Sequence, residues 1–362
     1  MCEIMKEIEK LRRRIDEIDD QLLELINQRL MVARHIGDIK RRFGAAVVDA
    51  RRENQIYQRL SSLNGGPLKE AALHRIFQAL IAAGRGIQSP LKKGSLVPLY
   101  VVIGNPIGHS LSPLMHNSAL AHEGLGGCYL ACQVKDIAAA VAGIRGLGIR
   151  GASITIPHKV SVMEYLDEVD PMATDIGAVN TIVNQDGILC GYNSDCAGGV
   201  QAISDKTVIK DKDVAIIGAG GGARALGFGL KREGGVVTII NRTPSRGEKL
   251  AGDLGCRFRP LAEVNELPYH IVVNATPAGM TPDVDGIPLS SSLLEPETVV
   301  MDMVYNPLQT RFLKEAQSRG CVTVDGVAMF VHQGAVQFEL WTSLAAPVDI
   351  MRQVVLEELE SR

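Results

Sequence analysis

The chain has 362 residues, of which 46% are hydrophobic, so it is long enough to bury the cores of two or three domains. A formal net charge of −3 and an aromatic content of 4% give no electrostatic case for nucleic-acid binding or for attachment to a membrane. No apolar run approaches the roughly 20 residues of a membrane span, the N-terminus is unlike a signal peptide, and the cysteines lack metal-binding spacing, so we expect a cytoplasmic protein without a metal.

The first predicted element is one long helix. From Ile4 to Ile39 there is no proline, and no glycine before Gly37, and apolar residues recur at helical spacing at positions 8, 11, 15, 18, 22, 25, 32, 36 and 39. Such a helix is roughly 60 Å long at about 1.5 Å per residue. The short segment that follows cannot cover it, so we expect a homodimer in which two of these helices pack together.

Cations lie on or near this apolar seam. Arg29 and Lys40 fall on nearly the same helix face, and Arg12 lies further round. Buried unpaired cations are costly, so their presence indicates an anionic partner. The other interpretation is that these long side chains simply extend out of the seam into water.

Two shorter helices complete this part of the chain. One begins at Asp49, which suits an N-cap, and the other runs from about Pro67 to Gln88. With its cations and these three helices, the module of residues 1–88 resembles the all-helical, intertwined-dimer type of chorismate mutase over nearly all of residues 4–88.

The resemblance implies an all-α three-helix domain that rearranges chorismate to prephenate without a cofactor. The positions that match the site of this family are Arg12, Arg29, Lys40, Asp49, Arg52, Glu53 and Gln88. It implies that the arginines hold the substrate carboxylates, with Arg12 reaching the partner's site. Lys40 and Gln88 would stabilise charge on the breaking ether oxygen. Glu53 would bind the ring hydroxyl, and Gly84 stands where some members have serine.

A short polar segment, residues 89–95, is typical of a linker and ends the helical module. Residues 99–104 then form an apolar strand that leads through a turn-rich loop to a helix. Ser110 and Ser112 lie near the start of this helix, where two hydroxyl groups can bind a carboxylate. Alternatively, they only cap the helix.

Further strands and turns follow the same plan. Residues 151–156 form a strand and turn that place Thr155 and Lys159 together, with Lys159 expected at a helix start. Asn180 and Asp195 lie in later polar loops that follow strand-like runs. Each of these loops alone would be an ordinary surface connection.

A glycine-rich turn follows the apolar run of residues 214–217. Its residues are Gly218, Ala219, Gly220, Gly221, Gly222 and Ala223, and a helical pattern comes next. A G-x-G-x-x-A pattern between a strand and a helix is typical of a dinucleotide turn, because backbone N–H groups and the positive helix end face a pyrophosphate. A plain strand-to-helix turn with spare glycines is the alternative.

The second strand of this unit favours NADP over NAD. NAD-binding folds usually place an acidic residue at its end, where it binds the ribose 2′-hydroxyl. This chain instead has Asn241, Arg242, Thr243 and Arg246. A guanidinium group fits a 2′-phosphate through bidentate, charge-assisted hydrogen bonds. The alternative is a solvated arginine pair.

These segments, in this order, resemble shikimate dehydrogenase over residues 99–362. The resemblance implies an α/β substrate domain of residues 96–195 and 326–362, and a Rossmann NADP domain of residues 196–325. It implies reversible NADP-dependent reduction of 3-dehydroshikimate to shikimate, with Lys159 and Asp195 as the catalytic pair. Substrate-binding positions are Ser110, Ser112, Thr155, Asn180, Tyr305 and Gln333, and the nicotinamide side has Asn274, Thr276, Met303 and Gly326.

The chain departs from this family's pattern at two places. Ser153 replaces a usual asparagine, and Asn193-Ser194-Asp195-Cys196 replaces the usual Asn-Thr-Asp-Gly. The whole sequence therefore predicts a bifunctional shikimate-pathway enzyme of aromatic amino acid biosynthesis, both isomerase and oxidoreductase. The alternative is an NAD-linked quinate/shikimate dehydrogenase whose N-terminal helices only dimerise or sense an aromatic effector.

Overall fold

The computed structural model describes the backbone of residues 2–43, 50–70, 72–73, 76–77, 80–81, 84 and 97–361. Two compact units make up the chain, Met1–Val97 with Leu120–Gly127, and Pro98–Ala119 with Cys128–Arg362. The predicted site residues Asp49 and Gln88, the linker of residues 89–95 and the side chain of Glu53 lie outside the described residues. The domain boundaries expected from the sequence stay predictions. No helix in the described ranges is long and apolar enough to span a membrane.

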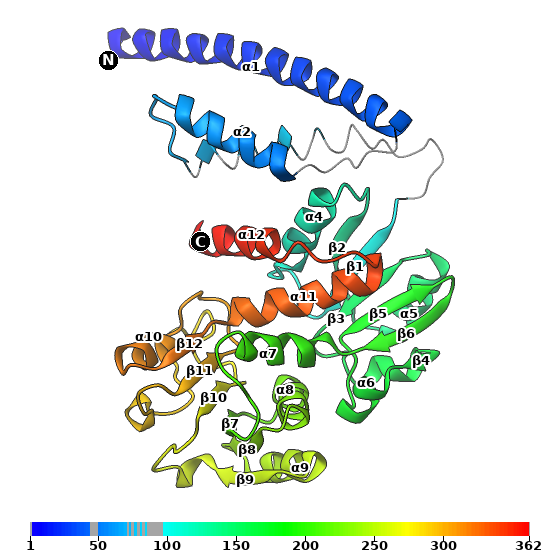
Figure 1. Cartoon of the computed structure of the whole chain (residues 1–362), viewed down its shortest axis with the longest axis vertical. Coiled ribbons are helices and arrows are strands. Elements are labelled where there is room, and N and C mark those ends of the chain that lie inside the picture. Colours follow the sequence, from blue (N-terminus) through cyan, green and yellow to red (C-terminus); the bar gives the residue numbers. More distant parts are fainter. Residues whose placement is uncertain are drawn as a thin grey trace. The chain divides into compact units, whose positions relative to one another are not determined.

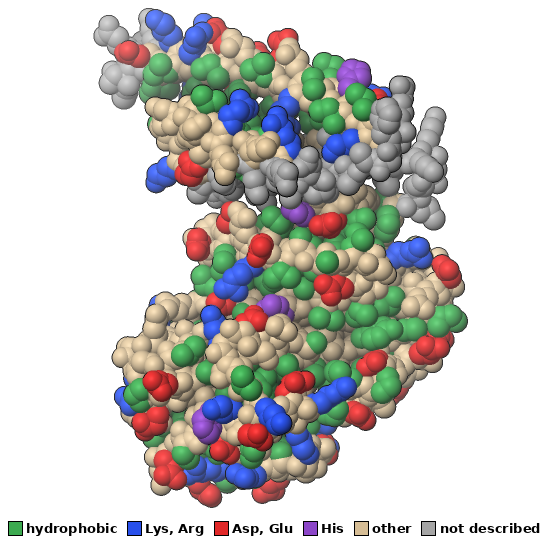
Figure 2. All heavy atoms as spheres, in the orientation of Figure 1, with side chains coloured by type: hydrophobic (Ala, Val, Ile, Leu, Met, Phe, Trp, Pro, Cys, Tyr) green, Lys and Arg blue, Asp and Glu red, His purple; other side chains and the backbone are tan. Residues whose placement is uncertain are grey.

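The helical unit begins with α1 (Cys2–Phe43), a helix of 42 residues that confirms the one predicted from apolar spacing. It continues with α2 (Ala50–Leu63), and residues 72–73, 76–77, 80–81 and 84 are also helical. Gly37 is buried, and an ideal Cβ on Gly84 would lie 3.5 Å from the Cβ of Ala33, so one face of α1 packs within the unit. The predicted seam is left open, since Leu11 and Leu25 are each 60% exposed in the single chain (Figure 2).

The first sheet has the strand order β2-β1-β3-β5-β6-β4 (Figure 1). Its strands are β1 (Leu99–Gly104), β2 (Cys128–Gln133), β3 (Gly151–Ile154), β4 (Glu168–Val169), β5 (Thr181–Gln185) and β6 (Ile188–Tyr192). Its helices are α4 (Ser112–His122), α5 (Ile137–Gly146) and α6 (Pro171–Ile176), with the 3-10 helix η1 (Ser161–Tyr165). The apolar residues of these strands and of α5 pack into one core, which includes Val101, Ile144 and Ile182.

The register of this sheet brings three loops together at one end of its strands. β1 and β3 are parallel, so the loops after Gly104 and Ile154 leave the sheet at the same end. β5 is antiparallel to β3, with Ser153 opposite Thr181, so the residue that precedes β5 also lies at this end. That residue is Asn180, and the sheet therefore places it beside Thr155 and the Ser110 loop.

The second sheet is parallel throughout and has the order β12-β11-β10-β7-β8-β9. Its strands are β7 (Asp213–Ile217), β8 (Val236–Asn241), β9 (Arg257–Pro260), β10 (Ile271–Asn274), β11 (Val299–Asp302) and β12 (Val322–Val324). Its helices are α8 (Gly221–Arg232), α9 (Pro244–Leu254) and α10 (Arg311–Ser318), with the 3-10 helices η2 (Leu261–Glu263) and η3 (Ser291–Leu293). This is the doubly wound order, and the strand order reverses between β7 and β10, where such sheets bind dinucleotides.

Three further helices are α7 (Ser194–Ser204), α11 (Gly326–Thr342) and α12 (Val348–Ser361), of which α12 packs against α11. α7 and α11 pack side by side between the sheets (Figure 1). Their contact is close, because an ideal Cβ on Gly198 would lie 2.6 Å from the backbone nitrogen of Gln333. Only glycine fits there. The close packing of α7 on α11 brings the start of α7 and the middle of α11 to the end of the first sheet at which Asn180 lies.

Candidate active sites

A cavity of about 420 Å³ lies where the loops after β1 and β3 meet α7 and α11. Its lining contains every predicted substrate-binding and catalytic residue of the second unit: Ser110, Ser112, Thr155, Lys159, Asn180, Asp195, Tyr305 and Gln333. Met303 and Gly326, predicted on the nicotinamide side, also line it. Segments 223 positions apart in sequence, from Ser110 to Gln333, thus form one site.

Lys159 and Asp195 form a direct ion pair in this cavity. The distance from Lys159 Nζ to Asp195 Oδ2 is 2.5 Å, and the two side chains are only 24% and 12% exposed. Asp195 lies in the first turn of α7, which Asn193 caps by accepting a hydrogen bond from the Cys196 N–H. A proton donor and a charge-compensating partner are therefore held together, with little water around them, where a substrate can enter.

The predicted helix start at Lys159 is wrong. Residues 157–160 form turns, and the 3-10 helix η1 begins only at Ser161. The segment between Lys159 and β4 at Glu168 forms this 3-10 helix in place of an α-helix. Lys159 is held instead by its backbone, since its carbonyl oxygen accepts a hydrogen bond of 2.8 Å from the Val179 N–H.

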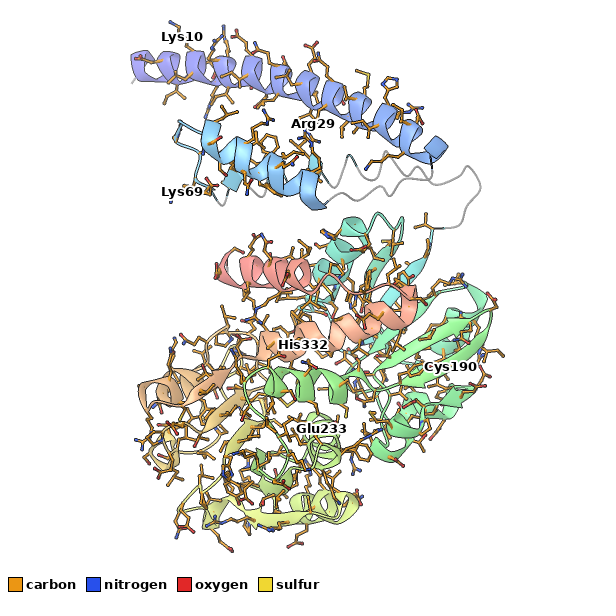
Figure 3. The ribbon with its side chains drawn as sticks, viewed as in Figure 1. Lys10, Arg29, Lys69, Cys190, Glu233 and His332 are labelled. Carbon is orange, nitrogen blue, oxygen red and sulfur yellow. The ribbon has the colours of Figure 1, made fainter. Side chains whose placement is uncertain are left out.

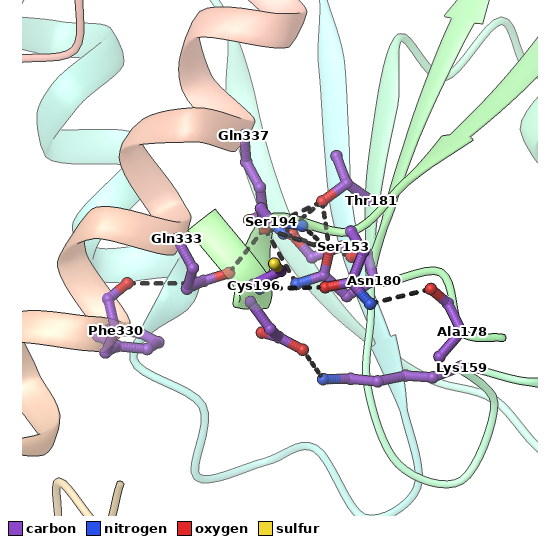
Figure 4. Close-up of polar contacts among 12 residues, drawn as sticks. Ser153, Lys159, Ala178, Asn180, Thr181, Ser194, Cys196, Phe330, Gln333 and Gln337 are labelled. Carbon is purple, nitrogen blue, oxygen red and sulfur yellow. Dashed lines mark hydrogen bonds and ion pairs between the residues drawn. The ribbon is translucent and has the colours of Figure 1, made fainter. Parts of the chain in front are cut away.

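Two amide side chains lie beside the ion pair (Figure 4). Asn180 Oδ1 accepts hydrogen bonds from the Ser194 N–H at 2.7 Å and from the Thr181 hydroxyl at 2.8 Å, and Asn180 Nδ2 donates to Ser194 Oγ at 2.9 Å. Gln333 Nε2 donates to the Phe330 carbonyl at 2.9 Å. Both amides are therefore oriented before any substrate binds.

The start of α4 supplies two hydroxyl groups. Ser110 Oγ accepts a hydrogen bond of 3.3 Å from the N–H of Ser112, the first residue of α4, and Ser110 also lines the cavity. His116 lies one turn further on, is 1% exposed, and stacks on Tyr129 with 4.5 Å between ring centroids. Neither of its ring nitrogens has a hydrogen-bond partner among the described residues. Burial lowers the pKa of His116 to about 3, so this imidazole is neutral.

The glycine turn after β7 has the geometry that a pyrophosphate needs. Gly218 has a φ of 120°, and a Cβ there would lie 2.9 Å from the carbonyl oxygen of Ala275, so only glycine fits. Gly220 and Gly221 face open space. Gly220 is the N-cap of α8 and offers no side-chain acceptor, so the first N–H groups of α8 are left for an anion. Ala223 is fully buried and allows α8 to pack on the sheet.

The end of β8 also fits a phosphate group. Arg242 and Arg246 are exposed, and neither guanidinium forms an ion pair or hydrogen bond within the part of the chain that the structure describes. Thr243 is the N-cap of α9, yet its hydroxyl makes no capping hydrogen bond. Asn241 Nδ2 donates to the Thr243 carbonyl at 2.8 Å and shapes this turn. Two cations, one hydroxyl and a helix N-terminus are thus available to a 2′-phosphate.

Asn274 is a buried residue that orients the predicted cofactor-site residue Thr276 through hydrogen bonds. It has no exposed surface, so its predicted contact with a cofactor does not come from its side chain. Its Oδ1 accepts from the Thr276 N–H at 3.0 Å and the Thr276 hydroxyl at 2.7 Å, and its Nδ2 donates to Asp302 at 2.9 Å. Asp302 is equally buried and also accepts from the Val304 N–H and the Thr310 hydroxyl. Burial raises the pKa of Asp302 to about 6.

In the helical unit, Arg29 is the predicted residue with the clearest place. It is half-buried on the side of α1 that faces α2 (Figure 3), and its Nη1 donates to the Leu80 carbonyl at 2.8 Å. An ideal Cβ on Gly84 would lie 3.7 Å from the same nitrogen. Lys40 is half-buried, whereas Arg52 is exposed and donates to Gln55 at 3.5 Å.

Arg12 behaves differently from Arg29. Its side chain is 67% exposed, and its guanidinium lies 3.8 Å from Glu9 on the same helix. The described residues of a single chain therefore do not bring Arg12 to Arg29. No structural observation tests the other predicted positions of this unit, Asp49, Glu53 and Gln88, which lie outside the described side chains.

Several residues of the cavity lining were not predicted as site residues, and Gln337 and Ser153 are two polar ones. Gln337 was not considered at all, and Ser153 was noted only as a departure from a family pattern, yet both line the cavity. Gln337 follows Gln333 by four residues on α11, so the two share one helix face. That spacing is the signal that could have identified it.

Comparison with known families matches three regions of the chain. Residues 102–182 match the shikimate dehydrogenase substrate binding domain, residues 326–356 match the shikimate 5'-dehydrogenase C-terminal domain, and residues 11–89 match chorismate mutase type II. The N-terminal match covers the predicted positions from Arg12 to Gln88.

Curated relatives and a solved structure agree with this assignment. A shikimate dehydrogenase (NADP(+)) from Bacillus mycoides is 43% identical over 274 residues, 72% of this chain and 98% of the relative. One from Moorella thermoacetica is 44% identical over 275 residues, 72% of this chain and 93% of the relative. Shikimate 5-dehydrogenase from Thermus thermophilus, solved with NADP(H) and shikimate, is 36% identical with a TM-score of 0.68, covering 72% of this chain and 99% of its own. The chain belongs to the shikimate dehydrogenase family, and a chorismate mutase type II domain precedes its dehydrogenase region.

Proposed function

We propose that this chain is a bifunctional enzyme that reversibly reduces 3-dehydroshikimate to shikimate with NADPH and rearranges chorismate to prephenate. The observation that carries the first activity is the Lys159–Asp195 ion pair, enclosed in one cavity with two serine hydroxyls and two oriented amides. The match of residues 11–89 to chorismate mutase type II supports the second activity.

The groups around the cavity define the roles in the reduction. Ser110 and Ser112 bind the substrate carboxylate at the start of α4, and Tyr305 closes over it. Thr155, Asn180 and Gln333 bind the ring hydroxyls. Lys159 Nζ donates a hydrogen bond to the ketone oxygen and polarises it, while Asp195 orients this ammonium group and balances its charge.

Proton transfer completes the step. Bound NADPH supplies a hydride to the ketone carbon, and the oxygen must then gain a proton. The ion pair holds that proton next to the reacting oxygen, and either Lys159 or Asp195 transfers it. In the oxidation of shikimate the same pair removes the hydroxyl proton.

The cofactor is held from the second sheet. The turn Gly218–Ala223 and the free N-terminus of α8 bind the pyrophosphate. The 2′-phosphate is bound by Arg242, Arg246, Thr243 and Asn241 at the end of β8. Thr276, Met303 and Gly326 lie on the nicotinamide side, and Met303 approaches the turn at Gly222. These contacts favour NADP over the NAD-linked alternative.

The mutase site is shared between two subunits. The apolar seam of α1 is left exposed by its own chain, and a second copy of α1 is the surface that matches it in length and pattern. In such a homodimer Arg12 of one subunit enters the site of the other, where Arg29, Lys40 and Arg52 surround the dianionic substrate. A role limited to dimerisation gives no reason for Arg29 and Lys40 to lie on an apolar seam. The cytoplasmic location expected from the sequence stays a prediction.

A reciprocal pair of variants of the full chain tests both activities. Lys159→Ala is expected to abolish NADPH-dependent reduction of 3-dehydroshikimate and to leave chorismate consumption unchanged. Arg29→Ala is expected to do the opposite. Reduction retained by Lys159→Ala contradicts the assignment of the cavity. If the wild-type chain reduces 3-dehydroshikimate but does not consume chorismate, the helical module is a sensor or a dimerisation unit.

A further inference from the structure

A buried polar network forms the floor of the cavity behind the proposed substrate contacts. Ser153 is 6% exposed and Gln337 is 1% exposed, and both contribute to the cavity lining. Ser153 comes from β3 and Gln337 from α11, so the network joins the sheet to the helix that carries Gln333. Figure 4 shows Gln337, Ser153, Asn180 and Thr181 bonded around this point.

The direction of each hydrogen bond in the network can be assigned. Gln337 Nε2 lies 3.3 Å from the Asn180 carbonyl oxygen and 3.0 Å from Thr181 Oγ1. A backbone carbonyl only accepts hydrogen bonds, so this atom of Gln337 must be the donating nitrogen. Gln337 Oε1 is then an acceptor, and it lies 2.8 Å from Ser153 Oγ. The single hydroxyl proton of Ser153 therefore points to Gln337.

The other side of Ser153 is fixed by Tyr129. Burial raises the pKa of Tyr129, so its phenol keeps its proton, and its hydroxyl donates to Ser153 Oγ at 2.6 Å. Ser153 thus receives one hydrogen bond and gives one. Its remaining lone pair is the part of the hydroxyl that is left for the cavity.

The side-chain amide of Asn180 has the opposite role and offers the cavity a hydrogen-bond donor. Asn180 Oδ1 already accepts from the Ser194 N–H, which can only donate, so the amide group of Asn180 has a spare N–H and no strong acceptor to offer. A substrate hydroxyl that accepts a hydrogen bond from this N–H keeps its own proton for another partner. In the same cavity, the free lone pair of Ser153 Oγ can accept the proton of this substrate hydroxyl.

We propose that Gln337 is a positioning residue of the dehydrogenase site: it holds the Ser153 proton and so makes Ser153 a hydrogen-bond acceptor for a ring hydroxyl of the substrate. The inference rests on the proposed reduction of 3-dehydroshikimate. Gln337 itself touches no reacting atom. Without the Gln337 acceptor, the Ser153 proton turns towards the cavity. The Ser153 O–H and the Asn180 N–H are then both donors to the same substrate hydroxyl.

The test compares two ends of the same hydroxyl group. Gln337→Met keeps the chain length and removes the acceptor, and it is expected to raise the KM for shikimate roughly five- to tenfold, the loss of one hydrogen bond, with kcat little changed. Tyr129→Phe removes the donor but leaves the Ser153 proton on Gln337, so its KM is expected to change about twofold or less. The KM for NADP+ serves as the internal control for both. Equal effects of the two variants on the KM for shikimate would overturn the proposal, because they indicate a merely structural role.

Substrate analogues give a readout that a structural defect would not produce. Shikimate has two ring hydroxyls that do not react, and 4-deoxyshikimate and 5-deoxyshikimate each lack one. For the analogue that lacks the hydroxyl facing Ser153, the wild type and Gln337→Met are expected to have the same KM. A Gln337→Met defect that persists equally for shikimate and for both analogues contradicts the inference.

The double variant Ser153→Ala/Gln337→Met covers the case in which the single variant is unstable, because it also removes the unpaired Ser153 hydroxyl. Its KM for shikimate is expected to equal that of Ser153→Ala, since Gln337 acts through Ser153. A further rise in KM refutes this coupling. Failure of the proposed function can be told apart from failure of this inference, because the wild-type chain would then not reduce 3-dehydroshikimate at all.

Discussion

His116→Phe tests the buried, unpaired histidine beneath the proposed carboxylate site. In the folded chain His116 is 1% exposed, stacks on the ring of Tyr129 and lies at an angle of 52° to the ring of Trp341. Gln337 lies beside it, but the amide of Gln337 is already bonded to Ser153 and Thr181. Burial outweighs the hydrogen bond that Gln337 offers to a protonated His116, so a proton on this imidazole is strongly disfavoured. A phenyl ring keeps the stack and cannot take up that proton.

The sign of the effect follows from the pKa values. Burial lowers the pKa of His116 from 6.5 to about 3, so as pH falls the unfolded chain binds this proton before the folded chain does. Stability that is present above pH 6.5 is then lost as the pH falls towards 3. Between pH 7 and pH 5 this one group costs the wild type about 2 kcal/mol of unfolding free energy. His116→Phe is expected to avoid that loss.

Thermal unfolding of both proteins at pH 7, 6 and 5 measures the difference. The Tm of His116→Phe relative to wild type is expected to rise by roughly 4–8 °C between pH 7 and pH 5, at about 2–4 °C per kcal/mol for a domain of this size. His35→Phe is the matched control, because His35 is exposed on α1 and folding changes its surroundings little. A Tm difference between His116→Phe and wild type that stays constant with pH would refute an uncompensated, neutral His116.

Three further predictions concern the other parts of the chain. Arg242→Ala/Arg246→Ala is expected to raise the KM for NADPH about 10- to 100-fold through lost charge-assisted hydrogen bonds and to leave the KM for NADH unchanged, as steady-state assays with each cofactor will show. For Asp302, burial raises the pKa from 3.8 to about 6, so the contribution of this carboxyl group to stability is fully present below pH 3.8 and is lost as pH rises through 6. Asp302→Asn is expected to remove up to roughly 3 kcal/mol of that pH dependence in unfolding experiments from pH 4 to pH 7.5. Leu25→Glu places a charge on the open seam of α1, where Leu25 is 60% exposed. It is expected to shift the protein from dimer to monomer in sedimentation experiments and to reduce chorismate consumption but not dehydroshikimate reduction, and an unchanged dimer would contradict the proposed interface.

The sequence was most informative where a local pattern has one physical meaning. The apolar spacing of residues 4–39 predicted α1, and the strand, glycine turn and helix around Gly218 predicted β7 and α8, because backbone geometry leaves few alternatives there. Ser110 was noted from the residues themselves, near a helix start, whereas the catalytic role of Lys159 came only from the family resemblance. Parallel strands bring the loops that follow them to one edge, so the proximity of these loops in space follows from their order.

Two local features depend on packing between distant elements and could not be predicted from the sequence. In the sequence Asn274 stands at the start of a polar loop. In the structure its side-chain amide is buried and donates a hydrogen bond to Asp302 on the next strand. In place of the expected helix at Lys159 the chain forms a turn and the 3-10 helix η1, which is followed by the short strand β4 at Glu168. Neither outcome can be read from the residues themselves.

Ser153 shows why a departure from a family pattern has to be judged together with its neighbours. A serine supplies a shorter side chain than the usual asparagine, and on sequence alone this loses an amide from the cavity floor. In the folded chain, the amide of Gln337 reaches Ser153, Thr181 and the Asn180 backbone from α11. The close contact at Gly198 holds α11 where Gln337 can do this. If the two positions act together, Ser153→Asn is expected to impair the site while Gln337 is present, since the longer side chain competes for the space and partners of the Gln337 amide.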